Sequence, residues 1–376
     1  MPGRNSAVFR PGWLQTGFAL ALSMISTMGA GACPLCYEAA RQMMTEGVRL
    51  DSADRAVLAK RDVGDGSLRV VAVVKGEAAI GEKVAEPVAD YSDATSAQEP
   101  SLLIASQSAP QWTSLGAAPL AYADWLRLVV ATREIAGDRP RRPWPLTTAT
   151  ADVLSYEGWR QRVELVLPYL ENPNPLAARL AWGELARAPY RAMDVARSQI
   201  DAAKVTTWID DPKLAPRRAA YLMLLGFVGG PEDARRLDAR LETALAAHDA
   251  KDLAALIAAD LELGGPSHLE WIEARIFADR SRTMPEIEAA LLALNVLGDA
   301  NGSVPRARVI EAYRDFIRRR PAMAGFVAPQ LAEWNYWDAA ADYSALAKAN
   351  ATMDPASQMA IRLYLTRAAA AGIVTH

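Results

Sequence analysis

LLGFVGGPEDARRLDARLE (residues 224–242) and ADLELGGPSHLEWIEARIF (residues 259–277) are two versions of one sequence pattern. Each contains an apolar segment, a Gly-Gly-Pro turn and a segment with leucine or isoleucine at helical spacing. The pattern recurs at a step of roughly 35 residues, and ALNVLGDANGSVPRARVIEAY (293–313) and PQLAEWNYWDAAADYSALAK (329–348) continue the series. A repeat of this length predicts stacked pairs of helices, because one pair cannot bury its own apolar face.

The residues at the turn indicate how each pair is built. We expect Gly229 and Gly264 at helix C-termini, in the left-handed conformation that glycine adopts without strain. We expect Pro231 and Pro266 at the first position of the next helix, where a backbone N–H is not needed. Each unit is therefore predicted to be a helix, a tight turn and a second helix.

The two helices of a unit differ in how apolar they are. The second helices carry a single apolar stripe, predicted at Leu237, Leu241 and Leu245, at Leu269, Ile272 and Ile276, and at Val309, Tyr313, Phe316 and Ile317. The first helices, AAYLMLLGFV (219–228) and LAALIAADLEL (253–263), are apolar on more than one face. Such helices need neighbours on both sides, which is the arrangement inside an α-solenoid.

Upstream, LPYLENPNPLAARLAWGELA (167–186) resembles HEAT-type repeats, in which a helix ends at a proline-containing turn and an alanine-rich helix follows. VTTWIDDPKLAPRRAAYLMLLG (205–226) has the same form. The resemblance covers most of residues 156–371. It implies a HEAT-like α-solenoid and says little about activity.

Residues 33–136 have a different, β-type pattern. SLRVVAVVKG (67–76) is rich in β-branched residues, and Asp65-Gly66 just before it is a hairpin signal. Further strands are expected at residues 82–88 and 101–106, and residues 122–135 are expected to form a strand or a short helix. Several short strands separated by turns predict a small β-barrel or sandwich.

This β-rich part resembles the netrin-like, TIMP-type barrel family. The shared features are a leading cysteine, Cys33, the segment SADRAVLAK (52–60), and LRVVAVVKG (68–76), a valine-rich strand that ends in lysine-glycine. The resemblance implies an OB-like barrel. In the inhibitors of that family the leading cysteine chelates a protease zinc ion, which implies a metalloprotease-inhibitor-like role for Cys33. Those inhibitors also bridge this cysteine to a distant one, and the present sequence has no distant cysteine.

The first 32 residues have the pattern of a secretory signal peptide. Arg4 and Arg10 precede an apolar segment, and Ala30-Gly31-Ala32 is an A-x-A cleavage pattern. The densest apolar stretch, residues 17–28, is shorter than the roughly 20 residues that a membrane-spanning helix needs. We therefore expect an exported protein, in the periplasm, the cell envelope or the extracellular space. Membrane attachment is expected only if Cys33 carries a lipid or the signal stays uncleaved.

Cys33 and Cys36 are the two cysteines of the chain and form a CxxC motif. Export to an oxidising compartment favours a local structural disulfide. Redox chemistry or metal binding at the motif, and lipid attachment at Cys33, are the alternatives that the residues leave open. A zinc site would need two further ligands, and the three histidines lie far away in the sequence.

AGDRPRRPWPLTT (136–148) contains prolines at a density that stops both helices and strands. The predicted organisation is a signal peptide at 1–32, a β-rich domain with an N-terminal CxxC helix at 33–136, a Pro/Arg-rich linker at 137–148 and a HEAT-like repeat domain at 149–376. The expected fold class is thus α+β multidomain. As a whole, the chain resembles exported bacterial proteins that join a CxxC start, a small β domain and HEAT-like helices.

Few residues are candidates for catalysis. Asp210 and Asp211 are adjacent, but their position before Pro212 favours helix capping in solvent. His268 lies at the start of a predicted helix beside Glu270 and is interpreted as a surface packing residue. Nucleotide-binding, serine-hydrolase and metalloprotease motifs are missing from the sequence. We therefore expect no catalytic residues, no cofactor and no metal ligands besides the cysteine candidates.

Four aromatic residues gather near the C-terminal end: Trp334, Tyr336, Trp337 and Tyr343. They are interpreted as the core of a terminal repeat, with the lining of a binding groove as the alternative. The chain has 41 Lys and Arg against 44 Asp and Glu, so its charge does not suggest a nucleic-acid partner. The predicted function is non-enzymatic binding of a protein or peptide by the helical surface. The alternative is thiol- or metal-dependent activity, or an inhibitor-like role, through Cys33 and Cys36.

Overall fold

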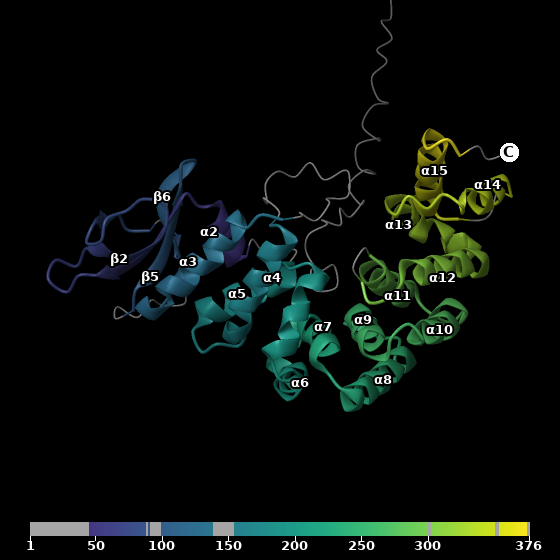
Figure 1. The fold of residues 1–376 in the computed structure, drawn as a ribbon, viewed down its shortest axis with the longest axis horizontal. Coiled ribbons are helices and arrows are strands. Elements are labelled where there is room, and N and C mark those ends of the chain that lie inside the picture. Colours follow the sequence, from purple (N-terminus) through teal and green to yellow (C-terminus); the bar gives the residue numbers. More distant parts are fainter. Residues whose placement is uncertain are drawn as a thin grey trace, which may run out of the picture.

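The computed structural model describes residues 45–87, 89–90, 99–137, 154–299, 302–349 and 353–373. Within these ranges the chain is an α+β protein, in which a β-sheet near the N-terminal end is followed by a long series of helices (Figure 1). At that level the expected fold class is confirmed. The predicted signal peptide, the CxxC helix with Cys33 and Cys36, and the predicted linker beyond Gly137 lie outside the described residues.

Six strands form one sheet in the order β3-β2-β1-β5-β6-β4. The strands are β1 (Arg55–Arg61), β2 (Leu68–Lys75), β3 (Lys83–Val84), β4 (Ala89–Asp90), β5 (Ser101–Ser106) and β6 (Ala109–Ala117). Neighbouring strands are antiparallel except for β4, which runs parallel to β6. The antiparallel strands curl into a half-barrel, where the sequence predicted a small barrel or sandwich.

The sequence predicted some strands better than others. β2 occupies the valine-rich stretch, and its residues alternate between buried and partly buried as a strand requires. The strand expected at 82–88 is reduced to Lys83–Val84. β6 was not predicted, because APQWTSLGA has few β-branched residues, and its antiparallel pairing with β5 determines its conformation. The segment 122–135 contains helix α3 (Ala123–Ala131).

Both faces of the sheet are buried. On β1, Ala56 and Leu58 belong to the large core that also contains the helices, whereas Val57 and Ala59 belong to a second, small core with Trp112 of β6. The alternation follows from the side-chain period of two along a strand. The large core continues through the helical part as far as α15, so buried contacts cross the predicted boundary between the β-rich and helical domains.

The remaining elements are helical. The α-helices are α2 (Glu46–Ser52), α3, α4 (Tyr156–Val166), α5 (Pro175–Arg187), α6 (Ala202–Asp210), α7 (Arg218–Val228), α8 (Pro231–Ala246), α9 (Leu253–Gly264), α10 (His268–Ile272), α11 (Met284–Leu297), α12 (Arg306–Arg319), α13 (Ala328–Glu333), α14 (Ala340–Lys348) and α15 (Pro355–Ala370). Short 3₁₀ or π segments join several of them, namely η1 (Leu120–Tyr122), η2 (Thr132–Glu134), η3 (Leu167–Tyr169), η4 (Tyr190–Ser198), η5 (Pro212–Arg217), η6 (Glu273–Phe277) and η7 (Pro321–Val327).

Local sequence signals explain several helix starts. Asn174 caps α5 by accepting a hydrogen bond from the Ala177 N–H, as a short polar side chain does at an N-cap. Pro231 begins α8 as predicted, whereas Pro266 lies two residues before α10 begins at His268.

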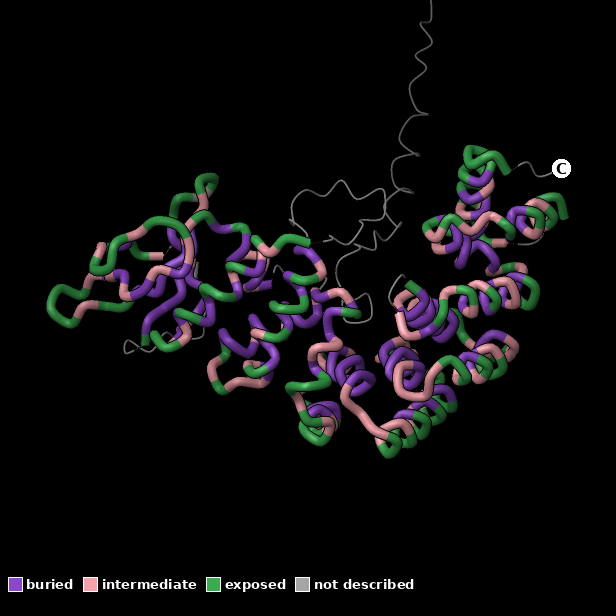
Figure 2. The backbone as a smooth tube through the Cα atoms, in the orientation of Figure 1, coloured by how far each residue is buried: buried purple, intermediate pink, exposed green. Residues whose placement is uncertain are grey.

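Helices α7, α9 and α11 lie side by side, with α9 in contact with both of the others. Residues 220–227 of α7 and residues 255–261 of α9 are all buried (Figure 2). Unbroken burial over two helical turns means that neighbours cover the helix on every side, as predicted. The predicted apolar stripes of the second helices are buried as well.

At Gly229 and Gly264, neighbouring atoms leave no room for a side chain. Gly229 has a φ of −70°, and the glycine with a positive φ at the second turn is Gly265, at 76°. A Cβ at Gly229 would lie 2.6 Å from the Leu225 carbonyl oxygen, and one at Gly264 would lie 2.4 Å from the His268 ring. The predicted left-handed conformation of Gly229 and Gly264 is therefore wrong, because close approach of neighbouring atoms selects glycine there.

Gly226 sets the distance between α7 and α9, since a Cβ there would lie 3.0 Å from the Cα of Ala259. We expect Gly226→Val to lower the free energy of unfolding by about 1–3 kcal/mol, the usual cost of overpacking a core. Urea denaturation measures the loss. Gly230→Ser is the matched control, because a Cβ at Gly230 meets nothing within 4 Å and serine is a favoured N-cap residue. An equal loss in both variants would contradict the close-packing explanation.

A buried ion cluster around Arg162 joins α4 and α5 to α2 and α3, two helices that contact the sheet. Its fully buried guanidinium donates to both carboxylate oxygens of Asp51 at 2.7 and 3.1 Å and to Glu184 at 2.9 Å. It also donates to the Thr132 hydroxyl and the Val129 carbonyl oxygen, both at 2.7 Å. All N–H donors of the guanidinium therefore have acceptors, and these come from α2, α3, η2 and α5.

Candidate functional site

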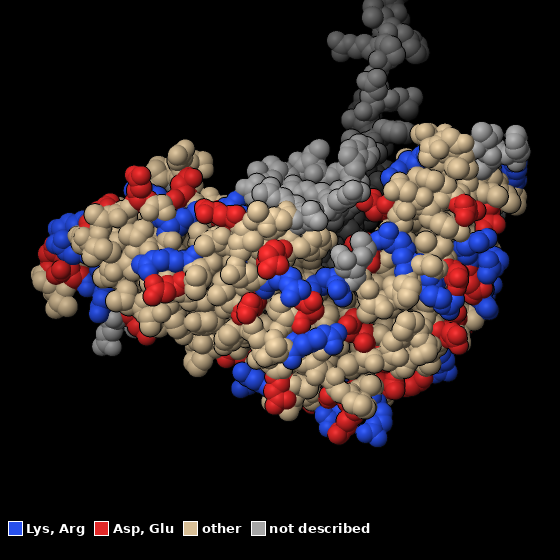
Figure 3. All heavy atoms as spheres, in the orientation of Figure 1, with Lys and Arg blue, Asp and Glu red and all other residues tan. Residues whose placement is uncertain are grey.

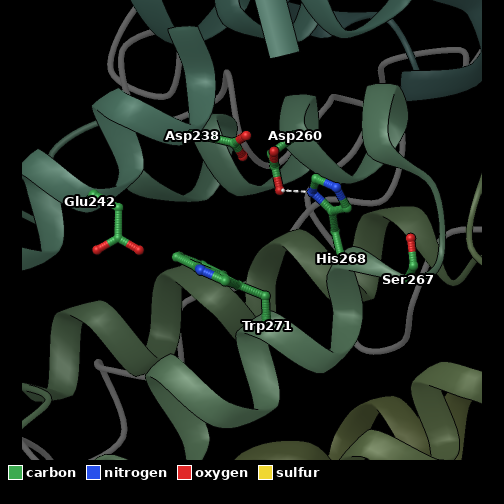
Figure 4. A pocket seen from close by; sticks show the side chains of 6 residues that line it. All are labelled: Asp238, Glu242, Asp260, Ser267, His268 and Trp271. Atoms are coloured by element: carbon green, nitrogen blue, oxygen red, sulfur yellow. Dashed lines mark hydrogen bonds and ion pairs between the residues drawn. The ribbon is translucent and has the colours of Figure 1, made fainter. Parts of the chain in front are cut away.

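A pocket of about 280 Å³ lies where α8 faces α9 and the start of α10 (Figure 4). It is lined by Asp238 and Glu242 of α8, Asp260 of α9, and Ser267, His268 and Trp271 at and around the start of α10. Asp238 and Glu242 are four residues apart, so both project from the same side of their helix. The pocket thus collects side chains from two consecutive helix pairs.

Asp260 is the buried acid of this pocket. It lies in the unbroken buried segment of α9 and is 2% exposed. The Nδ1 atom of His268 donates a hydrogen bond to its Oδ2 at 2.8 Å. The imidazole lies against Gly264, where a Cβ would come within 2.4 Å of ring atoms Cε1 and Nε2. The missing side chain at Gly264 therefore lets the ring turn Nδ1 toward Asp260.

The second carboxylate oxygen of Asp260, Oδ1, is buried and finds no hydrogen-bond partner among the described residues. The Asp238 carboxylate lies beside it (Figure 4). Burial is the largest influence on the pKa of Asp260 and raises it, His268 lowers it, and Asp238 raises it again, which leaves it at about 6. Two carboxylates this close repel each other unless a proton or a cation lies between them.

Asp238, Asp260 and His268 bring two carboxylate oxygens and a ring nitrogen within 4.8 Å of one another. Among the residues that the structure describes, these three side chains form the group that lies close enough together to hold a metal ion. Carboxylate and imidazole ligands are those that Zn²⁺ and Mn²⁺ accept. Glu242, at the rim, forms an ion pair with Arg275.

A second hollow of about 570 Å³ opens between α6, α7, α8 and α9, and we call it the interhelical groove. Its floor is apolar and includes Ile209, Leu222, Leu225 and Leu256. Its rim is polar, and an ion pair between Arg240 and Asp210 joins α8 to α6 there. The groove and the acidic pocket lie on different sides of α8.

The aromatic residues for which the sequence predicts core packing or a binding groove are Trp334, Tyr336, Trp337 and Tyr343. Trp337 and the fully buried Tyr343 pack on Tyr364 of α15, with ring centroids 5.3 and 4.8 Å apart. Trp334 stacks on Tyr313 of α12 at 5.9 Å, and the Tyr336 carbonyl oxygen accepts a hydrogen bond from the Tyr364 hydroxyl. Packing of the last helices accounts for these contacts, and a binding role for the partly exposed rings stays a prediction.

Asp211 and His268, which the sequence offers as candidates for catalysis, have clear structural positions. Asp211 caps η5 by accepting a hydrogen bond from the Lys213 N–H at 2.8 Å, as the capping interpretation predicted. His268 is part of the acidic pocket, which its interpretation as a surface packing residue did not foresee. The signal that could have found the pocket is Asp260, the single charged residue in LAALIAADL (253–261). A charge inside such an apolar helix needs a partner.

Acidic and basic side chains are interspersed among other residues over the face shown in Figure 3. Within the described ranges, no helix combines the length and the apolar character needed to span a bilayer.

Comparisons with protein-family models, with curated proteins and with solved structures found no match for this chain.

Proposed function

We propose that this chain is an exported, non-enzymatic scaffold that binds another protein or a peptide through its helical part. The observation that carries the proposal is the row formed by α7, α9 and α11, in which neighbours cover α7 and α9 on every side. Helix pairs that add along a line in this way are the basis of a HEAT-like α-solenoid, and such arrays bind partners along an extended surface.

The interhelical groove is the place on this surface that best suits a partner. An apolar floor with a polar rim matches an extended peptide segment that inserts an apolar side chain. Its size is that of ordinary ligand pockets, about 300–1,000 Å³. We therefore infer that the partner contributes an extended segment with an apolar anchor residue at this position.

Site-specific photo-cross-linking tests the proposal. Ala239 is exposed and lines the groove, so a photoreactive phenylalanine analogue placed there should cross-link to one discrete protein of the cell envelope. The same analogue at Glu311, an exposed position of α12 outside both hollows, is the control and should give no such product. Thr243→Arg should narrow the groove and suppress the product from position 239. Equal products from both positions, or no effect of Thr243→Arg, would refute the groove as the binding place.

The alternative hypothesis is thiol- or metal-dependent activity, or an inhibitor-like role, through Cys33 and Cys36. Both cysteines lie outside the described residues. The scaffold proposal expects Cys33→Ser/Cys36→Ser to leave the cross-link from position 239 unchanged. Loss of that cross-link in the double variant would favour the cysteine-dependent role.

A further inference from the structure

We propose that Asp238, Asp260 and His268 bind one divalent transition-metal ion, with Mn²⁺ and Zn²⁺ as the fitting candidates. The site lies between two consecutive helix pairs, because Asp238 belongs to α8, Asp260 to α9 and His268 to α10. Such a site goes beyond the proposed binding scaffold and is independent of it.

The donor geometry already suits an ion. Nδ1 of His268 and Oδ2 of Asp260 are 2.8 Å apart. Two neighbouring ligands at metal–ligand distances of about 2.0–2.2 Å stand roughly 3 Å apart when the metal is octahedral. Replacing the Nδ1 proton by the ion therefore needs little movement of these two side chains. Asp238 is exposed, so its side chain is free to close the remaining distance.

Burial supplies the second argument. Asp260 is 2% exposed, and its Oδ1 faces the pocket without a hydrogen-bond partner among the described residues. A buried acceptor without a donor is costly, and a neighbouring carboxylate makes it more so. A divalent cation would satisfy Oδ1 and offset the charge of both carboxylates together.

The surroundings leave room to complete the coordination. The pocket is about 280 Å³, which accommodates water molecules as further ligands. The Cε1–Nε2 side of the imidazole lies against Gly264, and Nδ1 is the nitrogen directed at Asp260. A bound ion would therefore tie α8 to α9 and α10 and should stabilise the folded chain, because the folded state binds it and the unfolded state does not.

Metal titration of the full-length protein tests this proposal. After treatment with a chelator, Mn²⁺ binding is followed by electron paramagnetic resonance of the free ion. Zn²⁺ binding is followed by calorimetry in a Cys33→Ser/Cys36→Ser background, which removes the other zinc-binding candidates. We expect saturable binding of one ion per chain and a rise in the unfolding temperature. Asp260→Asn, Asp238→Asn and His268→Gln should each raise the dissociation constant by at least about tenfold.

Two further variants separate ligation from mere folding effects. Gly264→Ala keeps every ligand but displaces the His268 ring, so it should also weaken binding. His248→Gln removes the histidine from a comparable histidine–carboxylate pair with Glu286 and should leave binding unchanged. Saturable binding of either ion that is lost in the ligand variants and kept in His248→Gln supports the site. If neither ion binds, or if binding survives Asp260→Asn and His268→Gln, the proposal is overturned and the two carboxylates share a proton instead.

Discussion

Arg162→Met should lower the free energy of unfolding by about 3–5 kcal/mol, because it removes the buried counter-charge that Asp51 and Glu184 share. Asp51 and Glu184 both depend on this guanidinium, and Glu184 is fully buried. Burial opposes the negative charge of Glu184, but Arg187 and Arg162 outweigh it and hold the pKa of Glu184 below its usual value. Chemical denaturation of the full-length protein, followed by circular dichroism, measures the loss.

The same helix provides the control for this prediction. Arg160 forms a surface ion pair with Asp194, and its side chain is 47% exposed. Arg160→Met should therefore cost less than about 1 kcal/mol, as exposed ion pairs usually do. Adding Asp51→Asn and Glu184→Gln to Arg162→Met should recover part of the stability, since the buried charges are then removed. Similar losses for Arg160→Met and Arg162→Met would contradict the stabilising role of the buried cluster.

Phe316→Ala should cost about 3–5 kcal/mol, the usual loss when a large buried aromatic side chain is truncated. Phe316 of α12 is fully buried and meets Phe277 of η6 edge to face, with ring centroids 5.0 Å apart. Arg320, at the end of α12, donates a hydrogen bond to the Phe277 carbonyl oxygen at 2.9 Å. The truncation therefore opens a cavity at the contact between two successive helix pairs.

Hydrogen exchange decides whether this loss stays local. In an array stabilised by nearest-neighbour contacts, α12 to α15 should exchange faster in Phe316→Ala while the β-sheet keeps its protection. Arg318→Ala on the same helix is the control, because that side chain is 59% exposed and should leave exchange unchanged. Uniform acceleration over the whole chain would argue for a single cooperative unit in place of an array of pairs.

The sequence predicted several helices and their buried faces well because their apolar residues recur with the helical period, whereas the α-solenoid arrangement stays a prediction. Apolar residues at helical spacing marked the buried stripes of α8, α10 and α12, and the apolar first helices had to be covered on all sides. The β-rich part was harder to predict. β6 lacks a β-branched run, and its antiparallel pairing with β5, the strand just before it in the chain, determines its conformation, so its own residues do not mark it as a strand.

The sequence by itself determined the helix pairs, the valine-rich strand β2 and the near-neutral surface, since each of these depends on residues close together in the chain. Only the tertiary structure decided the buried cluster around Arg162 and the convergence of Asp238, Asp260 and His268. These groups come from separate elements, and the packing of those elements brings charges together that the unfolded chain keeps in water. Desolvation then gives these charges their energetic weight, and it depends on which separate elements pack together, which the spacing of residues within one element does not encode.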